Sequence, residues 1–183
     1  MGKGGEAGGI TMSPGHKFKG NTMKILIIYD SVYGNTEQIA QAIGKTLGSQ
    51  NEVEILRVGE VKLPQLTGLD LLIVGSPTQR FRPTTAITQF LGGIPKDGLK
   101  GVKIAAFDTR LTISNINETP VLAFFVRLSG SAAYAARPIA DRLKKSGGDL
   151  IVPPEGFYVK GMEGPLVEGE LERAAEWVMK TVK

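Results

Sequence analysis

The chain has 183 residues, of which 42% are hydrophobic, and this is enough for one globular domain with a substantial core. Because it has no cysteine and only one histidine, His16, it cannot form a disulfide, a thiolate or multi-histidine metal site, or a Ser-His-Asp triad in its core. Any redox chemistry must therefore use a bound cofactor. The formal net charge of +4 falls to +2 without residues 1–22, which hold three lysines and one glutamate, and such a near-neutral body gives little support for nucleic acid binding.

Residues 1–22 contain seven of the 24 glycines and no apolar segment long enough for a secretory signal. They are predicted to form a flexible tail, which is either a natural extension or an artificial leader in front of Met23. Residues 23–183 are predicted to form the domain. The longest apolar run, residues 121–126, is far shorter than the roughly 18 residues that suggest a membrane span. We therefore expect a cytoplasmic protein without a membrane span.

The first motif follows an apolar run at residues 25–28, which predicts a buried strand. A loop rich in hydroxyl groups, residues 31–36 (Ser-Val-Tyr-Gly-Asn-Thr), joins this strand to an amphipathic stretch. Unpaired backbone N–H groups and the positive end of the helix dipole, equivalent to about half an elementary charge, favour an anion at such a helix start. Ser31 and Thr36 can add hydroxyl donors. The loop therefore predicts a phosphate site.

The kind of phosphate ligand is indicated by what the loop lacks. No lysine lies in residues 31–36, whereas a P-loop for nucleoside triphosphates needs a Lys-Ser/Thr pair. The Gly-x-Gly-x-x-Gly pattern of dinucleotide-binding folds is also missing after the strand. A single terminal phosphate, as in flavin mononucleotide (FMN), fits better. The alternative is an ordinary strand-to-helix turn with Asn35 as N-cap and Gln38 as its capping-box partner.

The rest of the chain alternates between strand and helix patterns. Further strands are predicted at residues 53–58, 69–74, 102–107 and 149–152, the last interrupted by Pro153-Pro154, which is compatible with a sheet edge or a bulge. Four apolar stripes at helical spacing predict helices: Ile39, Ala40, Ile43 and Leu47; Ala86, Ile87, Phe90 and Leu91; Ile139, Ala140 and Leu143; and Leu171, Ala174, Ala175, Val178 and Val182, with Trp177 beside the last stripe.

Five apolar strands alternating with helices predict an α/β fold of three layers, in which helices cover both faces of a doubly wound, five-stranded parallel sheet. In such a sheet the ligand lies outside the carboxyl ends of the strands, at the topological switch point. Three loops follow strand ends: residues 31–36, residues 76–83 and the loop from residue 108 onward. We expect these loops to form one site.

The sequence resembles the flavodoxin-like family in three features: the string at residues 31–36, the string Gly-Ser-Pro-Thr at residues 75–78 after the third strand, and the order of five strand-helix units. The resemblance covers residues 23–183 and implies a sheet order of 2-1-3-4-5 with FMN at the switch point between the first and third strands. Because the string at residues 75–78 is also present, the interpretation of residues 31–36 as an ordinary turn is much less favoured.

The resemblance also implies which residues bind FMN. Its phosphate would be held by Ser31, Tyr33, Gly34, Asn35 and Thr36. The flavin ring would be flanked by the loop after the third strand, with Ser76, Pro77, Thr78, Gln79, Arg80, Phe81 and Arg82, and by the loop after the fourth, with Asp108, Thr109 and Arg110. A flat ring with apolar faces and a polar edge calls for aromatic stacking and hydrogen bonds at that edge.

Three features depart from the pattern of short-chain electron carriers. Phe81 is the only aromatic residue in the loop after the third strand, and residues 108–111 offer none, so a double aromatic sandwich of the ring is not expected. The segment from Thr112 to Ala136 is long and forms a lid, an oligomer contact or a short extra helix packed on the core. Arginines at positions 80, 82 and 110 either raise the reduction potential of the flavin or point into solvent, whereas flavodoxins of the usual kind are acidic around the cofactor.

Two classes of redox function remain, together with a third reading. The first is an electron carrier that serves redox partner proteins through a non-covalent flavin. The second is an enzyme that reduces a small quinone with a hydride from a nicotinamide cofactor, although the chain lacks the Arg-Phe-Gly-Asn-Met string of the related quinone reductases. The third is a flavin-free binding module on an inherited fold. The first is favoured.

Overall fold

The chain forms one parallel sheet whose strand order is β2-β1-β3-β4-β5, as the sequence predicts. In the computed structural model the described residues are 22–112, 123–124, 128 and 134–182. The predicted tail thus lies outside the described residues except for its last member. The strands are β1 (Lys24–Tyr29), β2 (Glu52–Arg57), β3 (Leu71–Pro77), β4 (Lys103–Leu111), β5 (Asp149–Leu150) and β6 (Glu155–Val159).

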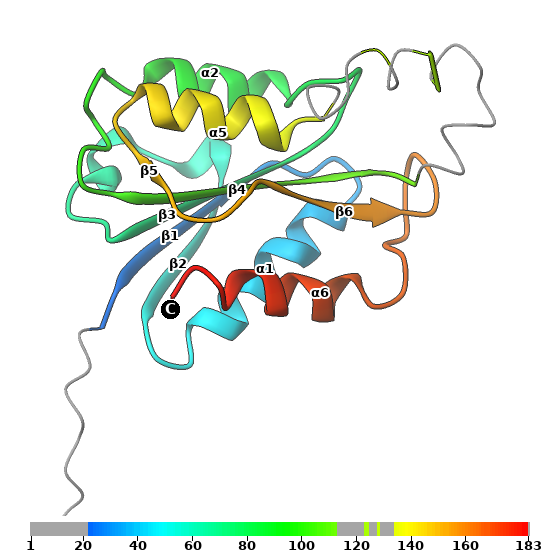
Figure 1. Ribbon diagram of the computed structural model, residues 1–183, viewed down its shortest axis with the longest axis horizontal. Coiled ribbons are helices and arrows are strands. Elements are labelled where there is room, and N and C mark those ends of the chain that lie inside the picture. Colours follow the sequence, from blue (N-terminus) through cyan, green and yellow to red (C-terminus); the bar gives the residue numbers. More distant parts are fainter. Residues whose placement is uncertain (1–21, 113–122, 125–127, 129–133, 183) are drawn as a thin grey trace, which may run out of the picture.

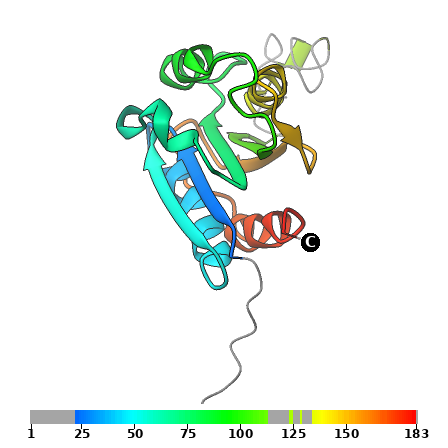
Figure 2. The ribbon, with the colours of Figure 1, turned by 90° about the vertical axis from the view of Figure 1, so that its left-hand side faces the viewer.

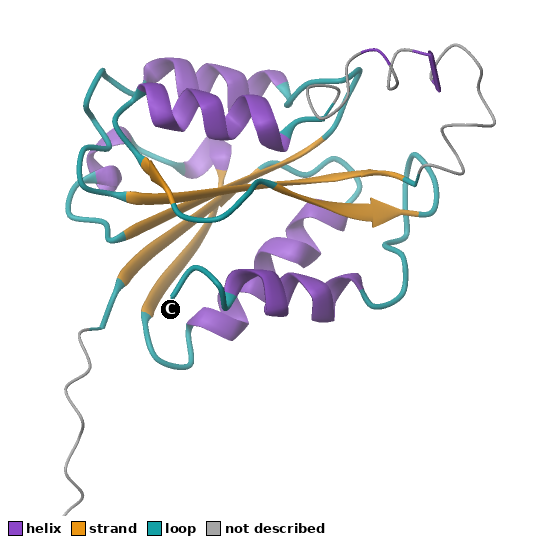
Figure 3. Ribbon diagram, in the orientation of Figure 1, coloured by secondary structure: helices purple, strands orange, loops and turns teal. Residues whose placement is uncertain are grey.

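Helices cover both faces of this sheet, which gives the predicted three layers (Figures 1 and 3). On one face lie α1 (Asn35–Leu47) and α6 (Glu170–Val178), and on the other lie α2 (Thr85–Gly93) and α5 (Ala136–Lys145). Figure 2 shows the twist that brings β1 and β2 to one side of the molecule. Two short 3₁₀ helices, η1 (Val58–Glu60) and η2 (Leu63–Leu66), lead from β2 toward β3.

The fifth strand position is occupied by two strands, because the chain bulges between them. Leu150 of β5 pairs with Ile104 and Glu155 of β6 pairs with Phe107, both on β4. Residues 151–154 therefore lie opposite only residues 105–106 of β4, and this excess of residues makes the chain bulge. Since Pro153 and Pro154 cannot donate to the ladder, the sheet resumes only after them. Both arrangements predicted from the proline pair are confirmed, because the chain bulges there and lies at the edge of the sheet.

Three aromatic side chains form the centre of the core beneath α6. Phe107, Phe157 and Trp177 meet edge to face, with ring centroids 6.0 to 6.3 Å apart. The predicted stripe of the last helix is therefore wrong in detail: Trp177 is 4% exposed, whereas Leu171 is 40% exposed. The cause lies at the start of α6, where the buried carboxylate of Glu170 accepts from Tyr158 N–H and leaves the next side chain outside.

In α2, Ile87 and Leu91 are buried as predicted, but Ala86 is exposed and Phe90 is half-buried. At the end of β3, Gly75 lets the Phe107 ring approach, since a Cβ atom there would lie 2.1 Å from Phe107 Cζ. This contact joins the core to the strand end that carries the next loop.

Candidate functional site

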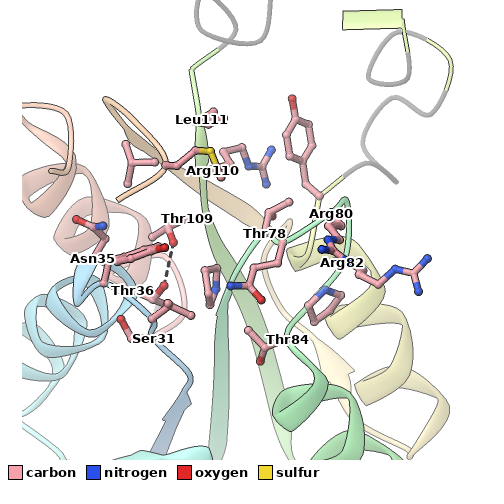
Figure 4. Close-up of a pocket in the computed structure, with 18 of the residues that line it drawn as sticks. Ser31, Asn35, Thr36, Thr78, Arg80, Arg82, Thr84, Thr109, Arg110 and Leu111 are labelled. Atoms are coloured by element: carbon pink, nitrogen blue, oxygen red, sulfur yellow. Dashed lines mark hydrogen bonds between the residues drawn. The ribbon is translucent and has the colours of Figure 1, made fainter. Parts of the chain in front are cut away.

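A cavity of about 1020 Å³ lies at the carboxyl ends of β1, β3 and β4 (Figure 4). The three segments predicted to meet do meet there, but residues 108–111 are the end of β4 and residues 76–77 the end of β3, so the prediction of loops at these positions is wrong: the ladder between the two strands continues to Pro77 and Thr109. Segments around β6 and before α5 complete the wall. The lining residues are Ser31, Val32, Tyr33, Asn35 and Thr36 after β1, residues 77–85 after β3, Thr109, Arg110 and Leu111 of β4, and Tyr134, Val159 and Met162.

The loop after β1 holds backbone N–H groups beside this cavity. Within the described part of the chain, no residue accepts a hydrogen bond from the N–H groups of residues 32–36. Gly34 precedes α1 with a φ of 83°, a left-handed conformation that glycine adopts at little cost, and as the N-cap residue it has no side chain to cap the helix; Ser31 Oγ accepts from the N–H of Glu37 at 3.4 Å. The open donors and the helix dipole make this end of the cavity favourable for an anion.

Asn35 does not cap the helix, because Gly34 occupies the N-cap position, so the predicted cap by Asn35 is wrong. Its side-chain Nδ2 instead donates to the carbonyl of Glu163, 3.0 Å away. Gly164 leaves space for this amide, since a Cβ atom there would lie 2.6 Å from Asn35 Nδ2. Asn35 thereby ties the turn after β6 to the loop after β1.

Thr36 and Thr109 form a buried pair of hydroxyl groups whose oxygens are 2.8 Å apart (Figure 4, dashed line). The two groups own two hydroxyl hydrogens, and the bond between them uses one. The other remains for a further acceptor. The pair can therefore offer one O–H donor to a ligand in the cavity.

Ser76 shapes the loop after β3 from beneath the cavity. Its hydroxyl donates to Pro77 O and accepts from the N–H of Thr84, both at 3.0 Å, and its side chain is fully buried. Thr84 in turn caps α2, accepting from Ile87 N–H. The loop thus leaves β3 and returns to α2 over a fixed base.

The outer part of that loop is a tight turn. Gln79 and Arg82 exchange two backbone hydrogen bonds of 3.0 and 3.1 Å. Between them, Arg80 and Phe81 have φ angles of 47° and 67°. Left-handed conformations cost non-glycine residues roughly 1–2 kcal/mol each, and the usual residues in such a turn are asparagine and glycine. The turn is therefore strained, and it places two arginines at the cavity mouth.

Asp108 lies behind the cavity wall. Its fully buried carboxylate accepts from Arg110 through Nε at 2.6 Å and Nη2 at 2.7 Å, and from Ala136 N–H at 2.8 Å. Burial raises the pKa of Asp108, while Arg110 acts in the opposite direction by stabilising the carboxylate. The bidentate pair balances the charge of Arg110 within the protein.

Arg110 is also held on both sides. Its guanidinium lies 3.8 Å from the centre of the Tyr134 ring, and burial raises the pKa of that phenol. On the other side, a Cβ atom at Gly156 would lie 2.1 Å from Arg110 Cζ. The cavity wall here is thus built from three elements, β4, β6 and the approach to α5.

Most of the predicted site residues line the cavity, but Gly34, Ser76 and Asp108 do not. These three shape the loops from outside it. The sequence prediction missed Val32, Pro83, Thr84, Thr85, Leu111, Tyr134, Val159 and Met162. Val159 is the last residue of β6, and Met162 lies in the turn after it. Predicting these two residues would have required the register in which β6 pairs with β4. The predicted lid or oligomer contact at 112–136 falls mainly on residues 113–122, 125–127 and 129–133, which lie outside the described residues.

Comparison with known proteins identifies the family. The model of the family described as "Flavodoxin domain" matches residues 26–149. The chain belongs to the flavodoxin family. This confirms the resemblance drawn from residues 31–36 and 75–78, and FMN as the cofactor follows from that membership.

Individual relatives among the flavodoxins match less of the sequence. A flavodoxin from Picosynechococcus sp. is 42% identical over 55 residues, which are 30% of this chain and 32% of that protein. The match thus spans about a third of the relative's length.

Solved structures share the fold. Flavodoxin 2 from Bacillus cereus superposes with a TM-score of 0.67 at 23% identity, covering 87% of this chain and 97% of that one. A flavodoxin from the domain Archaea gives 0.63 at 22% identity, covering 86% and 94%. The rubredoxin oxygen:oxidoreductase of Desulfovibrio gigas gives 0.64 at 16% identity, covering 86% of this chain but 34% of that one. At these identities the likeness supports the fold alone.

Among the described residues, no group of His, Cys, Asp or Glu side chains is arranged to hold a metal ion. In the same part of the chain, no helix combines the length and apolar character that crossing a bilayer requires.

Proposed function

We propose that this flavodoxin binds FMN non-covalently in the cavity and transfers electrons to and from redox partner proteins. The observation that carries the proposal is the set of open N–H groups at residues 32–36, which lie at the start of α1 beside the cavity. When bound, FMN supplies the one- and two-electron redox chemistry. The protein's part is to bind the cofactor, orient it and expose it to a partner.

The residues present fit this cofactor. The volume of about 1020 Å³ lies just above the roughly 300–1,000 Å³ usual for small-molecule sites. The phosphate would be held by the N–H groups of residues 32–36, by Ser31 and by the Thr36–Thr109 pair. The ring would lie toward the loop that carries Phe81. With open donors near one end and an aromatic residue in the wall, the cavity matches a ligand that has one anionic and one flat apolar part.

The reductase alternative is tested by asking what reduces the bound flavin. We expect NADH and NADPH to bleach the flavin of the FMN-loaded protein no faster than they bleach free FMN, while dithionite reduces it fully. A quinone reductase would instead be reduced by a nicotinamide at a typical enzyme rate of about 1–10³ s⁻¹ and would reoxidise with menadione. Absorbance at the flavin maximum in an anaerobic stopped-flow instrument distinguishes these results.

The proposal assigns this function to residues 23–183, with residues 1–22 as a tail that contributes nothing to FMN binding. We also propose that the protein is located in the cytoplasm. Removing residues 2–22 should leave FMN affinity unchanged, which a flavin titration of the shortened protein measures.

Replacing Thr36 with Val should weaken FMN binding by about 1.5–3 kcal/mol, the value of a hydrogen bond to a charged group. Because the Thr109 hydroxyl could rotate into the vacated position, the double variant with Thr109→Val is measured as well. The matched control is Thr46→Val on the same helix, whose hydroxyl donates to Ala42 O. Unchanged FMN affinity in the double variant would refute the phosphate assignment.

A further inference from the structure

The charge of the cavity lining is one-sided. Its lining residues include three arginines and no aspartate or glutamate. Arg110 is balanced by the buried carboxylate of Asp108, so Arg80 and Arg82 carry the net charge. The turn after β6 does not cancel it, because this turn holds one base and one acid, Lys160 and Glu163.

Arg80 and Arg82 are exposed, and neither has an ion-pair partner among the described residues. Figure 4 shows them on the side of the cavity opposite Ser31, Asn35 and Thr36, so they are separated from the proposed phosphate position. A phosphate held at residues 32–36 would therefore leave their charge available at the surface.

The backbone that presents these arginines is strained. Arg80 and Phe81 are both left-handed, where asparagine and glycine would be relaxed. Strained backbone of this kind persists only where the surrounding structure fixes it, and it clusters at functional sites.

The opposite side of the mouth is apolar and exposed. Val32 is 51% exposed, Tyr33 53% and Met162 81%, and all three line the cavity. Apolar side chains exposed together, beside charged ones, are typical of a surface that contacts another protein. The name "rim" is used below for Val32, Tyr33, Arg80, Arg82 and Met162.

From these observations we infer that the rim is a docking surface for a small acidic electron-carrier protein, with Arg80 and Arg82 facing its carboxylates. The inference rests on the proposed function, since it names the kind of partner with which the flavin exchanges electrons. Charges of opposite sign steer such partners together and orient them, and the apolar residues exclude water at the contact.

The test measures binding of two probe proteins of opposite charge, a dye-labelled plant-type ferredoxin, which is acidic, and mitochondrial cytochrome c, which is basic. Dissociation constants are taken from fluorescence anisotropy at low salt and again at about 0.2 M salt, where charges are screened beyond roughly 8 Å. The full chain is used with and without FMN, because the apoprotein keeps both arginines.

The double variant Arg80→Gln/Arg82→Gln is compared with Lys144→Gln/Lys145→Gln. The control lowers the net charge equally but changes exposed residues in the last turn of α5, at the other end of the helix from the cavity. We expect wild-type protein to bind ferredoxin in preference to cytochrome c. The arginine variant should bind ferredoxin roughly three- to tenfold more weakly at low salt, with little change in the control.

Three results would overturn the docking surface: equal weakening in both variants, preference for cytochrome c, or no binding of ferredoxin at low salt. Unchanged ferredoxin binding with a lowered reduction potential in the arginine variant would also overturn it, and would show that these arginines tune the flavin. If the protein fails to bind FMN, the proposed function is refuted instead. Arginine-dependent ferredoxin binding by the apoprotein would still support the docking surface in that case.

Discussion

Replacing Asp108 with Ala is expected to lower the free energy of unfolding by about 3–5 kcal/mol, because it leaves a largely buried guanidinium without its partner. Arg110 would lose both of its hydrogen bonds to the carboxylate, and the buried N–H of Ala136 would lose its acceptor. Since this carboxylate also joins β4 to the start of α5, the cavity wall around Tyr134 should loosen. Urea unfolding followed by circular dichroism measures the change.

Two controls separate this effect from general loss of charge. Asp141→Ala removes the exposed partner of Arg137, so a change within about 0.5 kcal/mol is expected. Combining Asp108→Ala with Arg110→Met removes both charges and should recover part of the lost stability. If Asp108→Ala costs no more than Asp141→Ala, the buried pair does not hold β4 and α5 together.

Replacing Trp177 with Ala is expected to lower the free energy of unfolding by about 3–5 kcal/mol, as for other large aromatic side chains removed from a core. Its ring contacts those of Phe107 and Phe157, and its indole N–H donates to the carbonyl of Pro153. The variant should therefore loosen α6 together with the bulge that separates β5 from β6.

Trp177→Phe keeps a ring in the cluster and should cost less than Trp177→Ala. The other control is Leu171→Ala on the same helix, because that side chain is already 40% exposed. Thermal unfolding should rank the losses as Trp177→Ala, then Trp177→Phe, then Leu171→Ala. A larger loss for Leu171→Ala than for Trp177→Ala would restore the stripe first predicted for the last helix.

The sequence was sufficient where the information is local. The apolar run of β1 and the stripe of α1 indicated the strand-helix unit, whereas the anion site predicted for the loop between them stays a prediction. The proline pair indicated the bulge in the fifth strand, because proline lacks the N–H that a ladder requires.

Side-chain direction in β4 could not be predicted, because it depends on which face each strand residue takes. Phe107 packs beneath α1 and α6, so the alternation of a strand directs Thr109 to the same face, where it meets Thr36. Asp108 takes the other face, where it accepts from Ala136. Because residues 108–111 were predicted to form a loop and not the end of β4, Asp108, Thr109 and Arg110 were equally plausible ligands.

Long-range contacts could not be predicted from the sequence either. The bond from Asn35 to Glu163 joins residues 128 positions apart, and it exists because the bulge sets where β6 ends. A local pattern favoured Asn35 as a helix cap, and tertiary structure overrode that preference by placing Gly34 there.

The most direct test of a phosphate-dependent FMN site is a titration of the flavin-free protein with FMN and, separately, with riboflavin, followed by quenching of flavin fluorescence. We predict saturable quenching by FMN and at least about a hundredfold weaker binding of riboflavin, which corresponds to about 2.7 kcal/mol contributed by the phosphate. Equal affinity for the two flavins would contradict a phosphate held at residues 32–36, and binding of neither would contradict the flavin site as a whole.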